Sequence, residues 1–274
     1  MRKGDTILFE APPVILAQGA VGGKKEGEGP LAAQFDLLFP ENSLGEATWE
    51  QAESRLQQHC LELTLQKARL PLERLSLVLG GDLQNQCTAT AYHMSRTDVP
   101  FAGLYGACST MTEALALAAC LAAGGCVEVA AALVSSHFCA AERQYRTPLS
   151  YGGKRTPTAQ WTATAAGCCL VAPDGTGPRV ASATFGRVRD YGVTDLTNMG
   201  AAMAPAAAET ILRHCADTHR TPADYDAVYT GDLGLVGSRL LAQLLKAEGL
   251  EIKNHTDCGL ELYDVHKQDV QAGG

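Results

Sequence analysis

Short apolar runs alternate along the chain with longer stretches in which apolar residues recur at helical spacing. Residues 49–67 carry Trp49, Ala52 and Leu56 on one face, which predicts a helix. The apolar runs are nearly continuous, as in strands that are buried on both faces of a sheet. We expect these strands in the first half at 14–21, 75–79, 101–105, 127–134 and 167–172. Strands alternating with helices indicate an α/β fold with a largely parallel sheet.

The same rhythm repeats in the second half. Strands are predicted at 180–185 and 227–230, and helices at 206–214 and 238–248. No linker interrupts the chain, so we expect one domain of two related halves, about 8–172 and 173–274. The second half holds fewer strand-like runs than the first, and Gly273-Gly274 resembles the start of a turn. We therefore expect the C-terminal strands of the second half to be missing.

Composition narrows the class of protein. Of the 274 residues, 46% are hydrophobic and 19% are charged, which favours a folded domain over a disordered chain. The net charge of −8 and the lack of a long basic stretch argue against a nucleic-acid partner. The ten cysteines form no C-x-x-C pair and no zinc-type spacing, so we expect reduced thiols and no metal site.

Membrane insertion is not indicated either. The longest apolar run, 114–127, is shorter than the ~20 residues that a bilayer span needs. Arg2 and Lys3 are followed by Gly4-Asp5-Thr6, which breaks any signal-peptide pattern. These features predict a protein that is soluble or peripheral at a membrane.

One cysteine stands out by its position. In "LYGACSTMTEALALAACLAAGG", Cys108 lies where a short apolar segment becomes a helix. Thr110 and Glu113 fit a capping box, which would place Cys108 beside the first helical amides. Those amides and the helix dipole favour a thiolate. The alternative interpretation is a small buried cysteine at a tight junction.

Three longer segments carry a resemblance. They are "GLYGACSTMTEALALAACLAAGG", "SSHFCAAERQYRTPLSYGGKRTPTAQWTATAAG" and "CGLELYDVHKQDVQAGG". Together they resemble the stage V sporulation protein AD family, a branch of the thiolase and ketoacyl-synthase fold, from about residue 8 to residue 274. The resemblance implies a layered α-β-α-β-α fold that binds dipicolinic acid (pyridine-2,6-dicarboxylate). It also implies work with other stage V sporulation membrane proteins, at the inner membrane of the spore, to load that acid. We expect no cofactor, and we leave open a homodimer and calcium accompanying the acid.

Condensing enzymes of this fold need more than a cysteine. They take a histidine and an asparagine, or two histidines, from loops of the second half to activate the thiol and hold the thioester oxygen. In the corresponding region this chain reads "TGDLGLVG", with Asp232 where a histidine is expected. An acid there opposes thiolate formation. We therefore expect Cys108 to mark a vestigial nucleophile position in a non-catalytic binding protein. The alternatives are an active ketoacyl-synthase or thiolase-type acyltransferase using Cys108, and a scaffold for membrane partners.

A receptor for a flat dianion needs cationic groups, hydroxyls or amides, and an apolar surface for the ring. The stretch 135–161 offers all three, although a solvated basic loop is the alternative interpretation. No oxygen-rich loop of calcium type is present in the sequence. The candidate ligand-binding residues are Cys108, Ser136, His137, Arg143, Arg146, Tyr151, Lys154, Arg155, Gln160 and Asp232.

Overall fold

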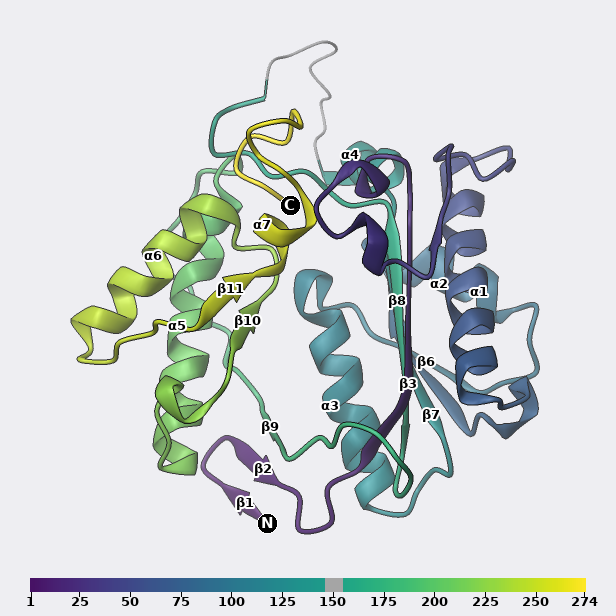
Figure 1. Ribbon diagram of the computed structural model, residues 1–274, viewed down its shortest axis with the longest axis horizontal. Coiled ribbons are helices and arrows are strands. Elements are labelled where there is room, and N and C mark those ends of the chain that lie inside the picture. The colour runs from purple at the N-terminus through teal and green to yellow at the C-terminus, as the bar shows by residue number, and fades with distance from the viewer. Residues whose placement is uncertain (146–154) are drawn as a thin grey trace.

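A six-stranded sheet forms the centre of the first half (Figure 1). The computed structural model describes residues 1–145 and 155–274. The strands lie in the order β4-β3-β8-β7-β5-β6. Their bounds are β3 Val14–Gly22, β4 Leu37–Leu38, β5 Leu77–Gly81, β6 Phe101–Gly103, β7 Ala130–Ser136 and β8 Ala165–Ala172. Every strand predicted for the first half is present, with ends shifted by a few residues.

The sheet is largely parallel, as expected, with one exception. β8 runs antiparallel to both of its neighbours, β3 and β7, whereas the β3–β4, β5–β7 and β5–β6 pairs are parallel. Residues such as Ala131, Leu133 and Leu170 have no exposed surface, because both faces of the sheet are covered. This explains why the strands have continuous apolar runs rather than alternating patterns.

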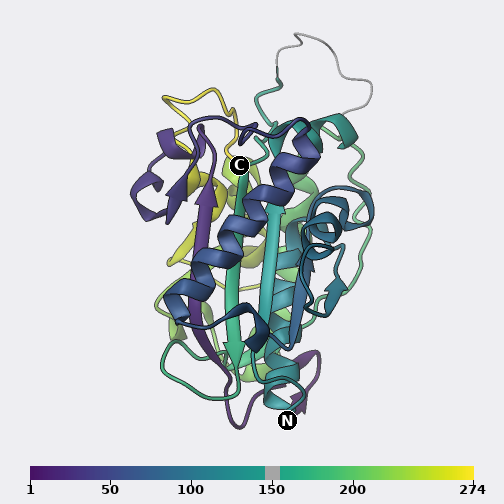
Figure 2. The same cartoon turned by 90° about the vertical axis from the view of Figure 1, so that its right-hand side faces the viewer.

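Helices cover the two faces. α1 (Trp49–Ala68) lies across one face, where Leu56 and Cys60 enter the core (Figure 2). Both ends of α1 have the caps that are typical of helix termini. At the N-terminus the Thr48 side chain accepts from the backbone N–H of Gln51, and at the C-terminus Arg69 adopts the left-handed conformation. α3 (Thr110–Ala123) packs on the opposite face through small residues, Ala114, Ala118 and Ala122.

Short strands from both ends of the chain and two long helices complete the structure. β1 (Arg2–Lys3), β2 (Thr6–Leu8) and β9 (Ser182–Thr184) form one small sheet, and β10 (Val228–Thr230) pairs in parallel with β11 (His255–Asp257). α5 (Met199–Thr218) and α6 (Gly234–Ala247) pack together beyond these strands. In Figure 1 the layers run from α1 through the large sheet, α3 and the short strands to α5 and α6. The layered, thiolase-like α/β architecture is confirmed, whereas the division into related halves and the missing strands stay predictions.

The remaining helices are short. They are α2 Thr88–Met94, α4 Phe138–Tyr145 and α7 Cys258–Leu262, with 3-10 turns η1 Glu26–Glu28, η2 Ala32–Gln34, η3 Leu72–Arg74, η4 Asn85–Cys87, η5 Ala107–Ser109 and η6 Pro222–Asp224. Within the described ranges, no helix combines the length and apolarity that a bilayer span requires.

One helix begins earlier than the sequence pattern predicted. We expected a helix at 206–214, but α5 begins at Met199, so Pro205 lies inside it. The Asn198 side chain accepts from the backbone N–H of Ala201 at 3.1 Å and caps the helix. Proline removes only one backbone donor, and the surrounding alanines favour the helix strongly enough to continue through it.

Candidate functional site

The segment around Cys108 makes a tight bend between β6 and α3. Ala107 adopts a positive φ of 48°, which is uncommon for a residue with a side chain. The η5 turn then carries Cys108 directly in front of α3. The predicted capping box is wrong: Thr110 is the first helical residue, and its hydroxyl accepts from the backbone N–H of Gly106 at 3.1 Å. The 3-10 turn before the helix shifts the capping position to Ser109, whose side chain makes no capping bond.

Cys108 is exposed as a residue, whereas the surroundings of its thiol group include the carboxyl group of Asp232. The thiol pKa is raised to about 12, first because burial disfavours the thiolate and then because of the charge of Asp232 and a hydrogen bond with it. We expected the helix terminus to favour a thiolate, and this expectation is wrong. The cost of removing the thiolate from water, together with a neighbouring acid, outweighs the amides of the first turn.

Asp232 comes from the loop between β10 and α6 and has a φ of 62°. The pKa of its carboxyl group is raised, mainly by burial and further by Asp257, whereas the bond from the Cys108 thiol acts in the opposite direction. The thiol is the donor and the carboxyl group is the acceptor. Among the described residues no histidine hydrogen-bonds to Cys108; His255 instead bonds to the hydroxyl of Thr230.

Asp257 fixes the loop that carries Asp232. Its two carboxylate oxygens accept from the Thr230 hydroxyl at 2.7 Å and from the backbone N–H groups of Leu233 at 3.0 Å, Gly234 at 2.9 Å and Gly259 at 3.1 Å. These four donors fix the position and orientation of the Asp257 side chain. Asp232 is thereby positioned next to a fixed negative charge.

Gln160 connects this loop to the basic segment predicted as a ligand site. Its side-chain amide donates to the backbone carbonyl of Asp232 and, at 3.0 Å, to that of Gly274. The carbonyl of Gln160 accepts from the Arg155 guanidinium at 3.1 Å. The contacts therefore run from Arg155 through Gln160 and Asp232 to Cys108, and four predicted site residues come together.

Arg155 lies in an aromatic cluster. Its guanidinium forms an ion pair with Glu142 at 3.1 Å and lies 4.7 Å from the centre of the Trp161 ring. Trp161 stacks on Phe138 with 4.0 Å between the ring centres, and the Lys25 ammonium lies 4.1 Å from the Trp161 ring centre. The arrangement combines cationic groups with a flat aromatic surface.

Ser136 and His137 take structural roles instead. The Ser136 hydroxyl donates to the carbonyl of Ala163 at 2.7 Å. His137 has no exposed surface; its Nε2 lies 2.8 Å from the carbonyl of Asn42, and its Nδ1 accepts from the backbone N–H of Cys139. The ring is therefore neutral with Nε2 protonated, and the pKa of His137 is lowered mainly by burial. Both ring nitrogens are used within the fold, which leaves neither for a ligand.

The other candidates divide into two groups. Arg143 pairs with Glu50, away from the Cys108–Asp232 contact in the hydrogen-bond network. Arg146, Tyr151 and Lys154 lie outside the described residues.

Two tyrosines lie near Cys108: Tyr145, an aromatic residue of the 135–161 stretch, and Tyr105, which was not a sequence candidate. The hydroxyls of Tyr105 and Tyr145 are 2.8 Å apart, and Tyr145 also donates to the carbonyl of Leu83 at 2.7 Å. The pKa of Tyr145 is raised, first by burial and then by the bond with Tyr105, and the charge of Cys108 contributes as well. These side chains add hydroxyl groups to the surroundings of the thiol.

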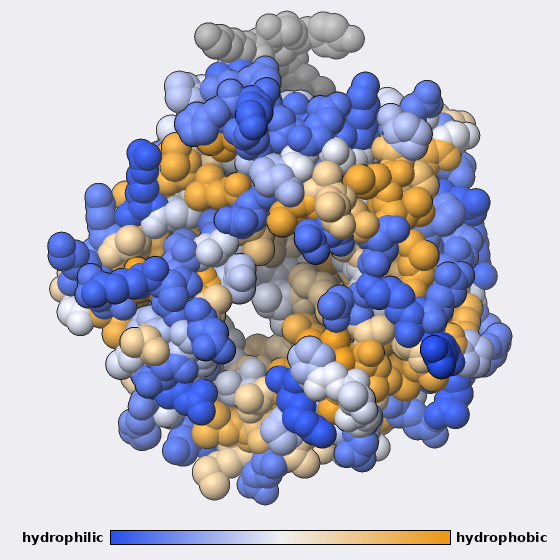
Figure 3. Space-filling model, in the orientation of Figure 1, coloured by the Kyte–Doolittle hydropathy of each residue, from blue (hydrophilic) through white to orange (hydrophobic). Residues whose placement is uncertain are grey.

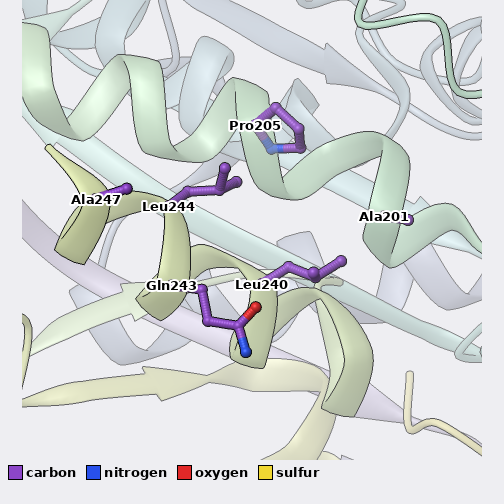
Figure 4. A pocket seen from close by; sticks show the side chains of 6 residues that line it. All are labelled: Ala201, Pro205, Leu240, Gln243, Leu244 and Ala247. Atoms are coloured by element: carbon purple, nitrogen blue, oxygen red, sulfur yellow. The ribbon is translucent and has the colours of Figure 1, made fainter.

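Two concave regions are visible on the surface. Figure 3 shows a face hollowed at its centre, in the region between α3 and the short strands of the second half. A separate apolar groove of about 260 Å³ lies between α5 and α6 and offers no charged group (Figure 4). That groove is lined by Ala201, Pro205, Leu240, Gln243, Leu244 and Ala247. Across the described residues, acids, histidines and cysteines form no group of three or more suited to a metal ion.

Comparison with known proteins gives a family match and a curated relative. A family model described as stage V sporulation protein AD (SpoVAD) matches residues 3–274. Stage V sporulation protein AD of Bacillus subtilis (strain 168) is 41% identical over 270 residues, which cover 98% of this chain and 80% of that protein.

Solved structures resemble the fold at much lower identity. OleA of Xanthomonas campestris, in a variant bound with cerulenin, has a TM-score of 0.61 and 15% identity over 91% of this chain and 83% of that chain. FabH of Xanthomonas oryzae pv. oryzae, a 3-oxoacyl-(acyl carrier protein) synthase III, has a TM-score of 0.58 and 14% identity over 91% and 85%. At these identities the likeness concerns the fold alone.

Proposed function

Because the chain belongs to the stage V sporulation protein AD family, we propose that it binds dipicolinic acid without catalysing a reaction and helps its uptake into the developing spore. The observation that carries this proposal is the hydrogen bond from the Cys108 thiol to the Asp232 carboxyl group. At the nucleophile position of the fold, the chain therefore has a thiol next to a carboxyl group. This pair suits ligand binding better than covalent chemistry.

The thiol is a poor nucleophile for a physical reason. With a pKa of about 12 it is ionised to roughly one part in 10⁵ at pH 7, and the thiolate is the reactive form. Cys108 therefore lines and shapes the pocket.

The neighbouring segment matches the chemistry of the ligand. Dipicolinate is a planar dianion, so its recognition requires cations, hydrogen-bond donors and a flat apolar surface. Arg155 and Lys25 provide positive charge, and Trp161 with Phe138 provides the aromatic surface. Gln160 links this cluster directly to the backbone of Asp232.

We further propose that the protein acts with other stage V sporulation membrane proteins and associates peripherally with the inner membrane of the spore. A homodimer and calcium entering with the acid remain part of this proposal without assigned residues.

The second candidate function is an acyltransferase of the ketoacyl-synthase or thiolase type. Its support is the position of Cys108 at the N-terminal end of α3 on a fold shared with 3-oxoacyl synthases. Such an enzyme requires an acyl-thioester on Cys108, whereas a binding protein requires none.

Isothermal titration calorimetry with dipicolinate and with an acyl-CoA separates the candidates. We expect saturable binding of dipicolinate, weaker binding of isophthalate, which lacks the ring nitrogen, and no acyl-enzyme by intact-mass analysis. The Cys108→Ser variant should bind dipicolinate within a few-fold of the unaltered protein. Acylation of Cys108, or equal binding of dipicolinate and isophthalate, would contradict the proposal.

A further inference from the structure

The loop that follows β5, residues 82–85, is anchored in the interior of the protein. The side chain of Asp82 accepts from the backbone N–H of Gln84 at 2.9 Å and from the Thr90 hydroxyl at 2.5 Å. The Gln84 side-chain amide donates to the Glu53 carboxyl group on α1 at 2.6 Å. None of these four residues exposes more than 5% of its surface. A lost partner would therefore leave a buried polar group unsatisfied.

These interior contacts belong to a closed ring of hydrogen bonds. The Ser135 hydroxyl on β7 donates to Glu53 at 2.7 Å. The Gln57 amide on α1 donates to the hydroxyls of Ser135 and Thr90, at 2.8 Å each. The ring thus joins α1, α2, β7 and the loop after β5. A fully connected polar network in a low-dielectric interior favours one arrangement of its members, so the ring fixes the backbone of the 82–85 loop.

The outer side of the same loop holds the end of α4. The Leu83 carbonyl accepts from the Tyr145 hydroxyl at 2.7 Å and from the Gln144 amide at 3.3 Å. The backbone N–H of Asn85 donates to the side-chain oxygen of Gln144 at 2.8 Å. The Tyr105 hydroxyl, from the segment between β6 and η5, lies 2.8 Å from that of Tyr145. One loop therefore docks both α4 and the segment that leads to the turn before α3.

α4 carries two side chains that contact the proposed ligand cluster. Phe138, at the start of the helix, stacks on Trp161 with 4.0 Å between the ring centres. Glu142, one turn later, forms the ion pair with Arg155 at 3.1 Å. A displacement of α4 therefore displaces the aromatic surface and the guanidinium group together.

We propose that Gln84 is a positioning residue for ligand binding: its amide ties the 82–85 loop to Glu53 and so fixes the Leu83 carbonyl on which α4 docks. This inference rests on the proposed function. Gln84 is buried, so it acts through α4 rather than by touching the ligand. Without the amide, the loop loses its contact with α1, and α4 no longer holds Phe138 and Arg155 in place for a planar dianion.

The test combines affinity with a spectroscopic signal from the cluster itself. The chain has two tryptophans, so Trp49→Phe leaves Trp161 as the one fluorescent reporter. In that background, Gln84→Met removes the amide and keeps the length of the side chain. Calorimetry should show dipicolinate binding weakened by about tenfold, the equivalent of one buried hydrogen bond. The emission of Trp161 should move to longer wavelength in the folded protein, because the ring loses its packing against Phe138.

Two further variants complete the test. Gln66→Met makes the same substitution at an exposed position of α1 and should change neither affinity nor emission. Tyr145→Phe removes the bond to the Leu83 carbonyl from the exposed side and should reproduce both effects to a smaller degree. If Gln84→Met does not fold, Tyr145→Phe decides alone.

The outcomes distinguish this inference from the proposed function. Unchanged affinity, or weaker binding with unchanged Trp161 emission, would overturn the positioning role of Gln84 and leave the proposed function standing. No dipicolinate binding by the unaltered protein would overturn both.

Discussion

The thiol of Cys108 donates a hydrogen bond to the carboxyl group of Asp232 across the interface between the first and second halves of the chain. Burial raises the pKa of both groups, so the pair favours its neutral forms. The bond joins the turn before α3 to the loop before α6, and thereby links the two parts of the chain at the point where a ligand is proposed to bind.

The first prediction concerns alkylation of Cys108. Cys108 and Cys126 are both exposed, but the thiol pKa of Cys108 is about 12, so iodoacetamide at pH 7.5 should modify Cys108 at least ~10-fold more slowly than Cys126. Asp232→Asn removes the neighbouring acid and should accelerate modification of Cys108 while leaving the rate at Cys126 unchanged. Peptide mass spectrometry follows both rates in one sample. Equal rates at the two cysteines in the unaltered protein would be inconsistent with this account.

The second prediction concerns Arg155 and corrects a simpler expectation. A solvated basic loop, the alternative interpretation of the sequence, would make Arg155 unimportant for stability, but the side chains of Arg155 and Glu142 are only 17% and 10% exposed. Arg155→Ala should therefore lower the free energy of unfolding by ~2–3 kcal/mol, since Glu142 loses this ion pair and Trp161 loses a packed neighbour. Urea unfolding measures the difference.

A surface ion pair provides the control for Arg155. Arg74 pairs with Glu128 at 3.1 Å, but the two side chains are 56% and 74% exposed. Arg74→Ala should cost less than ~1 kcal/mol. An Arg155→Ala variant that is no less stable than Arg74→Ala would show that Arg155 does not support the fold.

The third prediction is a loss of stability in acid at His93. Burial lowers the pKa of His93 to about 4, and its Nδ1 has no hydrogen-bond partner among the described residues. The unfolded chain binds a proton near pH 6.5 whereas the native state does not, so stability is complete above pH 6.5 and falls as the pH decreases towards 4. His93 should account for roughly 3 kcal/mol of this loss.

Urea unfolding at pH 7 and at pH 4.5 tests the role of His93. His93→Gln removes the titrating group, so its free energy of unfolding should vary less between the two pH values. The exposed His266→Gln variant is the control and should retain the pH dependence of the unaltered protein. A His93→Gln variant with that same dependence would refute the assignment.

The fourth prediction concerns the buried acid Glu53. Its carboxylate oxygens contact the Ser135 hydroxyl at 2.7 Å and the Gln84 amide at 2.6 Å, and burial followed by the charge of Asp82 raises its pKa to about 8. Protonated Glu53 stabilises the native state at low pH, and this stability is lost as the pH rises from 4.5 through 8. Glu53→Gln imitates the protonated acid and should be more stable than the unaltered protein at pH 9, by on the order of 3 kcal/mol.

The comparison at Glu53 is made by chemical unfolding at pH 4 and pH 9. At pH 4, where Glu53 is protonated in both the folded and the unfolded chain, the two proteins should differ little. The exposed Glu73→Gln variant should show no pH-dependent gain. Equal stabilities of Glu53→Gln and the unaltered protein at pH 9 would mean that Glu53 does not titrate as described.

Much of the fold could be predicted because burial imposes regular patterns. The helix expected at 49–67 is Trp49–Ala68 in the structure, since its apolar spacing and its Thr48 cap point to the same bounds. The start of α5 was missed, because Pro205 is a stronger sequence signal for a helix start than Asn198, although the asparagine side chain forms the cap.

The site was predictable one residue at a time but not as a set of contacts. Cys108 and Asp232 were each selected from local motifs, but their hydrogen bond depends on how the two halves pack. His137 lies in a promising polar segment, yet backbone groups of Asn42 and Cys139 use both of its ring nitrogens. Lys25 was missed because nothing near it in sequence indicates that Trp161 lies beside it. Long-range packing decides these cases, and one sequence carries no signal for it.

A crystal structure of the protein grown with saturating dipicolinate tests the central claim most directly. We predict the ligand in the crevice between Cys108 and the 231–234 loop, with one carboxylate within hydrogen-bond distance of the Asp232 side chain and no covalent bond to the sulfur of Cys108. Dipicolinate bound elsewhere, or absent from this crevice at saturating concentration, would contradict the account.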